Sequence, residues 1–359
     1  MSACLREGKL KIFLISGLVL VTAVPLAVYL YNYASSHTDQ QNVKGWTAPE
    51  IREEFEIQGL TWRTISYYYH PGIYREMYNR ESNERLIRKA KEAGANYLLV
   101  RVFYNGTENG GLVGDETEAK NSLKEAIATA HNHGMKILLV PYVESRDYWN
   151  RRWTLSEKIW TETVLKWAEF AEENGVEMFA PGVEMNLILE ENVSWKWLRE
   201  ILPKIREVYR GKVITAEHYD VGRWRILDEH GAFEGYDCIG LTFFPRKEYD
   251  GVSDIRSFGD YSDYMEEEAK TLDMLSEKYE IKCKLAVPMG LDYWKGSHEK
   301  QPNPDAAIVA QAASLGLDIL KRHNFTGVFI SHWASEPDHF GTRKDVEIML
   351  RKRWTKESP

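Results

Sequence analysis

The sequence predicts an α/β fold, a single (β/α)8 barrel preceded by one apolar N-terminal segment. Extended apolar runs and amphipathic helical runs alternate eight times. Together they span about 300 residues, which is typical of parallel β/α architecture closed into a barrel. No Gly-rich phosphate-binding turn follows the first extended run, although an open, doubly wound sheet usually carries one. A closed barrel therefore accounts best for the pattern.

The predicted strands are short runs rich in β-branched and aromatic residues, bounded by turn-forming residues. We expect them at residues 57–66, 97–104, 136–143, 178–184, 212–217, 237–244, 284–289 and 327–332.

The predicted helices show apolar residues at helical spacing. They are expected at residues 82–93, 120–133, 154–174, 194–209, 221–229, 261–279, 304–323 and 344–354. Ser82 and Asn303 are candidate N-caps, and Gly94, Gly134 and Gly175 follow three of the helices. Small polar residues at the start and glycine after the end are common helix boundaries.

The N-terminus predicts a membrane anchor. Residues 1–11 are basic, and residues 12–34 contain no charged side chain. A bilayer core is crossed by roughly 20 apolar residues, and basic residues before the span favour a cytoplasmic N-terminus. We therefore expect a single-pass cell-membrane protein with a linker at residues 35–45 and the barrel domain, residues 46–359, outside the cytoplasm. A cleaved signal peptide is the competing interpretation.

Composition narrows the possible partners. The formal charge of −8 and the lack of a basic stripe argue against nucleic acid. No metal-ligand spacing is present, and we expect no cofactor. Cys238 and Cys283 each lie near the start of a predicted strand, so they form either a disulfide, if the strands are neighbours, or two buried thiols.

Residues at the carboxyl ends of barrel strands converge on one pocket. Here they are acidic and aromatic, with a single arginine, and the chain as a whole has 12 Trp and 20 Tyr. Such a rim suits neutral sugars, which bind carboxylates and amides through hydrogen bonds and stack on aromatic faces. The candidate site residues are Trp62, Arg101, Tyr104, Tyr142, Glu184, Asn186, Glu217, His218, Asp292, Trp294, His332 and Trp333.

Four motifs carry a family resemblance. They are Ala93-Gly-Ala-Asn-Tyr-Leu-Leu-Val-Arg101, Gly182-Val-Glu184, Tyr236-Asp-Cys-Ile-Gly-Leu-Thr-Phe-Phe-Pro245 and Ser331-His-Trp333. In this order, on these strands, the chain resembles the retaining glycoside hydrolases with (β/α)8 barrels, close to families 113, 53 and 5. The resemblance implies that Glu184 is the acid/base, that Arg101 positions a second carboxylate, and that Trp333 forms the floor of a sugar subsite.

The chain departs from that pattern at two positions. Val183 precedes Glu184, where these families commonly have Asn. The seventh strand reads Ala286-Val-Pro-Met-Gly-Leu-Asp292, with Pro288 and Met289 where the nucleophilic Glu is expected.

Asp292 and Glu217 are the two candidates for the second carboxylate. Each also has a structural interpretation, since Asp292 could cap a loop and Glu217 could pair with Arg223 or Arg225. The sequence thus predicts a glycoside hydrolase that cleaves oligo- or polysaccharide. The alternative is a catalytically altered barrel that binds glycan or acts as a cell-surface scaffold.

Overall fold

We describe the protein from a computed structural model. It describes residues 55–62, 69–107, 109–144, 155–189, 191–218, 223–243, 258–290, 306–331 and 344–355. The anchor predicted at residues 12–34 lies outside these ranges. Within them, no helix is both long enough and apolar enough to cross a membrane.

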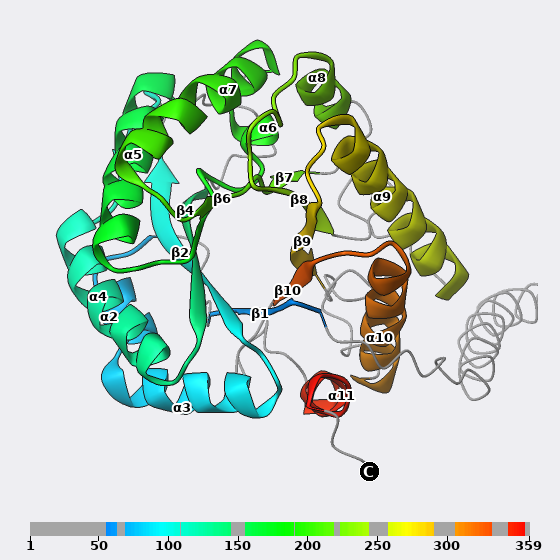
Figure 1. The fold of residues 1–359 in the computed structure, drawn as a ribbon. Coiled ribbons are helices and arrows are strands. Elements are labelled where there is room, and N and C mark those ends of the chain that lie inside the picture. Colours follow the sequence, from blue (N-terminus) through cyan, green and yellow to red (C-terminus); the bar gives the residue numbers. More distant parts are fainter. Residues whose placement is uncertain are drawn as a thin grey trace, which may run out of the picture. The chain divides into compact units, whose positions relative to one another are not determined.

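Parallel strands form a closed barrel, as predicted (Figure 1). The sheet order is β6-β5-β4-β2-β1-β10-β9-β8-β7. β6 and β7 are two parts of one extended segment, and Ile214 between them pairs with Cys238 of β8. The strands are β1 (Ile57–Thr61), β2 (Tyr97–Gly106), β4 (Lys136–Glu144), β5 (Met178–Phe179), β6 (Lys212–Val213), β7 (Glu217–His218), β8 (Cys238–Phe243), β9 (Cys283–Gly290) and β10 (Gly327–Ser331). The short β3 (Leu112–Val113) pairs antiparallel with the end of β2.

Helices surround the barrel (Figure 1), and every predicted helix overlaps an observed one. They are α2 (Ile73–Met77), α3 (Arg80–Glu92), α4 (Glu116–Asn132), α5 (Glu157–Glu173), α6 (Met185–Ile188), α7 (Glu191–Val208), α8 (Arg223–Glu229), α9 (Phe258–Lys278), α10 (Ala306–Arg322) and α11 (Lys344–Trp354). α4 begins four residues earlier than predicted because Asp115 caps it, accepting a hydrogen bond from the Glu118 N–H. α2, α6 and β3 were not predicted.

The core has two layers because successive strand residues point to opposite faces. One apolar cluster fills the barrel interior, and a larger one lies between strands and helices. Inside, a Cβ on Gly59 would lie 2.2 Å from the Phe329 ring. This ring fills the space beside β1, and only glycine fits there. On β2, Leu99 belongs to the interior cluster and its neighbours Leu98 and Val100 to the outer one.

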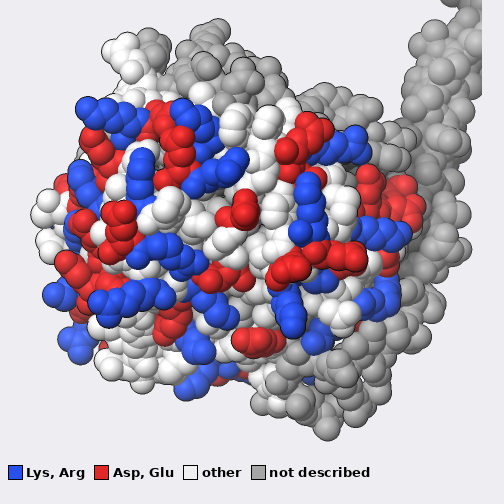
Figure 2. All heavy atoms as spheres, turned by 45° about the horizontal axis from the view of Figure 1, so that its top comes forward, with Lys and Arg blue, Asp and Glu red and all other residues white. Residues whose placement is uncertain are grey.

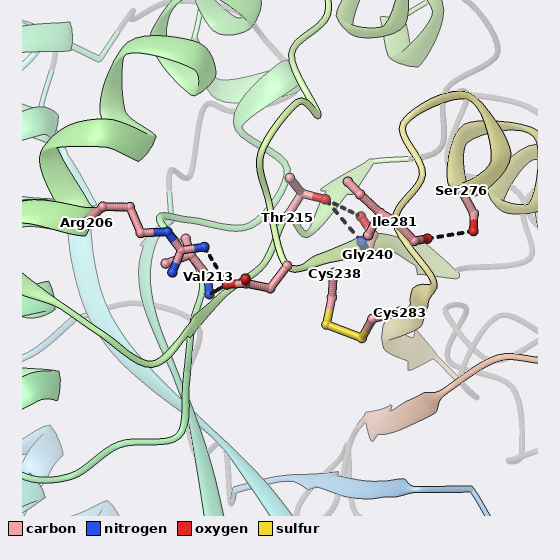
Figure 3. The surroundings of a disulfide bond; sticks show 9 residues. Arg206, Val213, Thr215, Cys238, Gly240, Ser276, Ile281 and Cys283 are labelled. Atoms are coloured by element: carbon pink, nitrogen blue, oxygen red, sulfur yellow. Dashed lines mark hydrogen bonds and ion pairs between the residues drawn. A yellow bond between two sulfur atoms is a disulfide. The ribbon is translucent and has the colours of Figure 1, made fainter.

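A disulfide joins Cys238 and Cys283, which resolves the two alternatives left by the sequence (Figure 3). The two residues face each other in the register of β8 and β9. Cys238 is fully buried in the interior cluster, and Cys283 packs against that cluster. The bond therefore links neighbouring strands at their amino-terminal ends. Nearby, the Thr215 side chain contacts the backbone of Gly240 (Figure 3).

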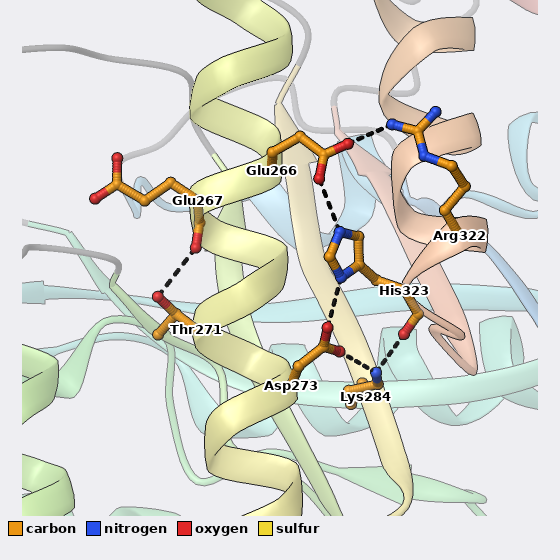
Figure 4. Close-up of polar contacts among 7 residues, drawn as sticks. All are labelled: Glu266, Glu267, Thr271, Asp273, Lys284, Arg322 and His323. Carbon is orange, nitrogen blue, oxygen red and sulfur yellow. Dashed lines mark hydrogen bonds and ion pairs between the residues drawn. The ribbon is translucent and has the colours of Figure 1, made fainter.

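A charged cluster joins α9 to the end of α10 (Figure 4). His323 Nδ1 lies 2.5 Å from an Asp273 oxygen and Nε2 lies 2.9 Å from a Glu266 oxygen. Lys284 binds Asp273, and Arg322 binds Glu266. Burial raises the pKa of Glu266, but the hydrogen bonds from His323 and Arg322 outweigh it and the net pKa is lowered.

The C-terminal helix α11 connects the last barrel unit with the first. Arg353 reaches α10, where its guanidinium lies 2.6 Å from the fully buried Asp318. Arg351 donates to the backbone carbonyl of Glu92 at the end of α3. On the face shown in Figure 2, acidic and basic side chains are interspersed over the described surface, without a large area of one sign.

Glu268 is a fully buried carboxyl group on α9, outside the barrel interior. The Tyr264 hydroxyl donates to one of its oxygens, and the other oxygen has no partner among the described residues. Burial raises its pKa well above the ordinary value of 4.5. The folded state therefore holds this proton more tightly than the unfolded state, and its stability falls as the pH rises above 4.5.

Glu268→Gln should therefore stabilise the protein at neutral pH. Between the pKa values of Glu268 in the unfolded and folded states, each rise of one pH unit should lower the free energy of unfolding of the wild type by about 1.4 kcal/mol relative to the variant. Denaturant unfolding at pH 4.5, 6 and 8 measures the difference. Glu277→Gln, an exposed residue on the same helix, is the control. An equal pH dependence in both variants would contradict a buried neutral Glu268.

Candidate active site

Buried Arg101, in the middle of β2, pairs with partly buried Tyr142, near the carboxyl end of the neighbouring β4. The Arg101 guanidinium lies 5.2 Å from the centroid of the Tyr142 ring, a cation–π distance. Arg101 is 5% exposed, and its Nε has no hydrogen-bond partner among the described residues. Arg101 follows Tyr97 and Leu99 in the strand alternation of β2, so it lies on the same interior face as they do. A buried cation thus faces the mouth of the barrel.

Glu184 follows β5 and precedes α6. Its backbone is left-handed, with φ 57° and ψ 36°, which is uncommon for a residue other than glycine. Its N–H donates to the Ala216 carbonyl at 2.8 Å, and the Thr242 hydroxyl donates to its Oε1 at 3.0 Å. Two neighbouring chain segments thus hold the half-buried Glu184, one through its backbone and one through its carboxyl group.

The strand before Glu184 is shorter than predicted, because β5 ends at Phe179. Pro181 and Gly182 follow, and a Cβ on Gly182 would lie 2.5 Å from Met185 Sδ. A side chain at residue 182 would therefore displace the Met185 side chain at the start of α6. This turn, and not an extended strand end, presents the carboxyl group.

Glu217 is buried, but the register turns it away from Glu184. It pairs with Leu241 of β8, which belongs to the cluster between strands and helices. Register partners in parallel strands share a face, so Glu217 points into that layer. Its charge there is the second cause, after burial, that raises the pKa of the Tyr236 hydroxyl. This placement argues against Glu217 as the second catalytic carboxylate.

Tyr104 also lies in the layer between strands and helices, away from Arg101 and Tyr142. Its hydroxyl accepts a hydrogen bond from Trp167 Nε1 at 2.6 Å, and its ring meets Trp160 edge to face. Both tryptophans belong to α5. Tyr104 therefore stabilises helix packing and does not line the site. Alternation along β2 is the reason, since Tyr104 is three residues from Arg101.

Trp62 lies at the end of β1 and is 3% exposed. Its ring centroid lies 5.5 Å from that of Tyr78, and the Tyr78 hydroxyl donates to the Arg101 carbonyl. Trp62 thus packs against the residue that supports Arg101.

The structure does not describe the side chains of six predicted site residues. The backbones of Asn186, in α6, and of His218, opposite Thr242, are described but their side chains are not. Asp292, Trp294, His332 and Trp333 lie outside the described residues.

The seventh strand carries no carboxylate between Lys284 and Gly290. Met289, which occupies the expected position of the nucleophile in the sequence, turns outward: a Cβ on Gly316 of α10 would lie 2.6 Å from its Cε. Gly290 pairs with Ser331 of β10 at the rim. In the part of the chain that the structure describes, no group of three or more His, Cys, Asp and Glu could hold a metal ion.

Sequence reasoning missed Thr242. It lies on β8, two residues beyond Gly240 and four beyond the interior Cys238. Strand alternation alone could have identified it as an inward-facing hydroxyl near the carboxyl end of the strand.

The chain was compared with known proteins. No curated protein matches it. Among solved structures, a family 113 β-1,4-mannanase aligns with a TM-score of 0.62 at 14% identity, covering 85% of this chain and 100% of that one. The family 113 β-mannanase AaManA from Alicyclobacillus acidocaldarius has a TM-score of 0.59 at 14% identity, with coverages of 84% and 97%. The endo-1,4-β-mannanase from Rhizomucor miehei has a TM-score of 0.58 at 12% identity, with coverages of 86% and 96%. At such identities these similarities establish the fold alone.

The model of Glycoside Hydrolase Family 113 matches residues 66–250. This range includes Arg101, Tyr142, Glu184 and Thr242 and ends before β9. Because it covers more than half of the chain, the protein belongs to Glycoside Hydrolase Family 113 and is an O-glycosyl hydrolase.

Proposed function

We propose that the protein hydrolyses β-1,4-mannan or mannan-derived oligosaccharides, with Glu184 as the acid/base. The main support is the position of Glu184 at the barrel rim, where the Thr242 hydroxyl binds its carboxyl group. The aligned mannanases of the same family suggest the substrate class.

The backbone of Glu184 supports a functional role. A non-glycine residue in the left-handed region costs roughly 1–2 kcal/mol. Such strain is found disproportionately at active sites, where it fixes a reacting group. Here two hydrogen bonds from neighbouring segments hold the strained residue in place.

Glu184 donates its proton to the glycosidic oxygen in the proposed reaction. The C1–O bond breaks, and its electron pair stays with the leaving oxygen. A retaining reaction needs a second carboxyl group about 5 Å away, and an inverting one needs a wider gap that admits water. With Glu217 turned toward the helices, we propose that Asp292, the first carboxylate after β9, is this second group. Arg101 then supplies the cation beside it.

We further propose that the barrel lies outside the cytoplasm, anchored by residues 12–34. The apolar run supports the anchor. The Cys238–Cys283 disulfide supports the location, because structural disulfides are rare in reducing compartments. The missing carboxylate on β9 favours one second candidate function, a barrel that binds mannan without cleaving it.

Glu184→Gln should lower turnover on β-1,4-mannan by a factor of roughly a hundred to ten thousand, because a general acid is lost. Substrates with good leaving groups need no protonation and should be affected far less in the first step. Turnover is measured as sugar release by the full chain. Glu173→Gln, at an exposed residue of α5, is the control. Unchanged turnover would remove Glu184 from the mechanism.

Asp292→Ala should abolish turnover if Asp292 is the nucleophile. Azide should then restore part of the activity and give a product of inverted anomeric configuration, measured by NMR. Glu217→Gln, the comparison variant, should alter stability more than chemistry. If Asp292→Ala stays fully active, or if the wild type binds mannan without cleaving it, this assignment fails.

Glu184→Gly should abolish activity yet be more stable than Glu184→Ala. Glycine adopts a positive φ freely, whereas alanine keeps the strain. This relief should exceed the cost of the larger unfolded-state entropy of glycine, so the free energy of unfolding should be up to about 1 kcal/mol higher than that of Glu184→Ala. Thermal unfolding of the two variants measures this difference. A less stable glycine variant would contradict the inferred strain.

A further inference from the structure

We propose that Thr242 is a positioning residue for the general acid: it holds Oε1 of Glu184, so that Oε2 carries the proton that is transferred. This inference rests on the proposed function and adds to it which carboxyl oxygen of Glu184 carries the proton.

The position of Thr242 is well determined by the fold. It is 1% exposed and lies on β8 opposite His218 of β7. Its hydroxyl reaches Glu184 Oε1 at 3.0 Å, while the chain just before β7 accepts the Glu184 N–H through Ala216. The backbone and the carboxyl group of Glu184 are thus held from two adjacent strands.

This contact distinguishes the two oxygens of the carboxyl group. A hydroxyl that donates to Oε1 occupies a lone pair of that oxygen, so in the protonated acid the hydrogen lies on Oε2. Oε2 makes no hydrogen bond among the described residues. During cleavage the Oε2 proton moves to the glycosidic oxygen, the C1–O bond breaks, and its electron pair stays on the leaving oxygen.

Thr242 also favours proton release. The carboxylate left behind spreads its charge over both oxygens, and the Thr242 donor stabilises that charged form. A hydrogen bond to a charged group stabilises it by an amount comparable with one pKa unit or more.

Other polar and charged groups lie on the barrel strands. Arg101 and Tyr142 lie on the interior side of β2 and β4, and the backbone of His218 shares the register of Thr242. Glu217 faces the helices. The four residues of α6, next to Glu184, are uncharged. None of these groups changes when only the Thr242 hydroxyl is removed.

Thr242→Val removes the hydroxyl and keeps the shape. It should lower kcat/KM about tenfold on substrates with poor leaving groups. The carboxylate loses a donor, so transfer of the proton to the glycosidic oxygen becomes harder. Activated substrates should be nearly unaffected in the first step. Thr242→Ser keeps the donor and should restore kcat/KM on substrates with poor leaving groups.

Thr215→Val is the matched control. Thr215 is a buried threonine in the segment before β7, and its hydroxyl contacts Gly240 and not Glu184. It should lower stability without changing kcat/KM on substrates with poor leaving groups. If Thr242→Val does not fold, Thr242→Ala is measured in its place.

Two outcomes separate this inference from the proposed function. If Glu184→Gln abolishes turnover but Thr242→Val leaves the leaving-group dependence unchanged, the role of Thr242 is wrong and the function stands. If Glu184→Gln has no effect, the proposed function itself fails.

Discussion

Closure of the sheet through residues 212–218 is the constraint on which the site depends. This segment pairs with β5 on one side and with β8 on the other. Once the sheet is closed, each strand residue faces either the interior or the helices. The Ala216 carbonyl, Thr242 and the Glu184 backbone then meet at one point of the rim. These contacts need a closed sheet, in which residues 212–218 pair with β5 and with β8 at the same time.

The sequence predicts the barrel well because strand and helix periodicities differ and glycines mark the helix ends. It predicts poorly whether a strand residue points into the barrel or toward the helices. A shift of one residue reverses the side of every residue in a strand, and the sequence does not set the register. Arg101 and Tyr142 therefore lie together as expected, whereas Tyr104 and Glu217, also assigned to the rim, pack under the helices.

Glu184 shows a second limit of sequence reasoning. Its position at the end of the fourth strand was predicted, but its backbone conformation was not. A left-handed glutamate is locally unfavourable and exists here because contacts from residues more than thirty positions away hold it. Local propensity contains no information on such contacts. Strand alternation could have placed the Thr242 hydroxyl on the interior face, but not its contact with a partner 58 positions away.

The disulfide has a consequence for the integrity of the chain. It closes a covalent ring of 45 residues that contains the whole of α9 and the connection that leads to it. Closing a ring of that size lowers the entropy of the unfolded chain by the equivalent of about 4 kcal/mol. A protease that cuts once inside the ring would leave both fragments attached, with β8 and β9 still joined. The chain could thus be cut there without losing either half of its barrel.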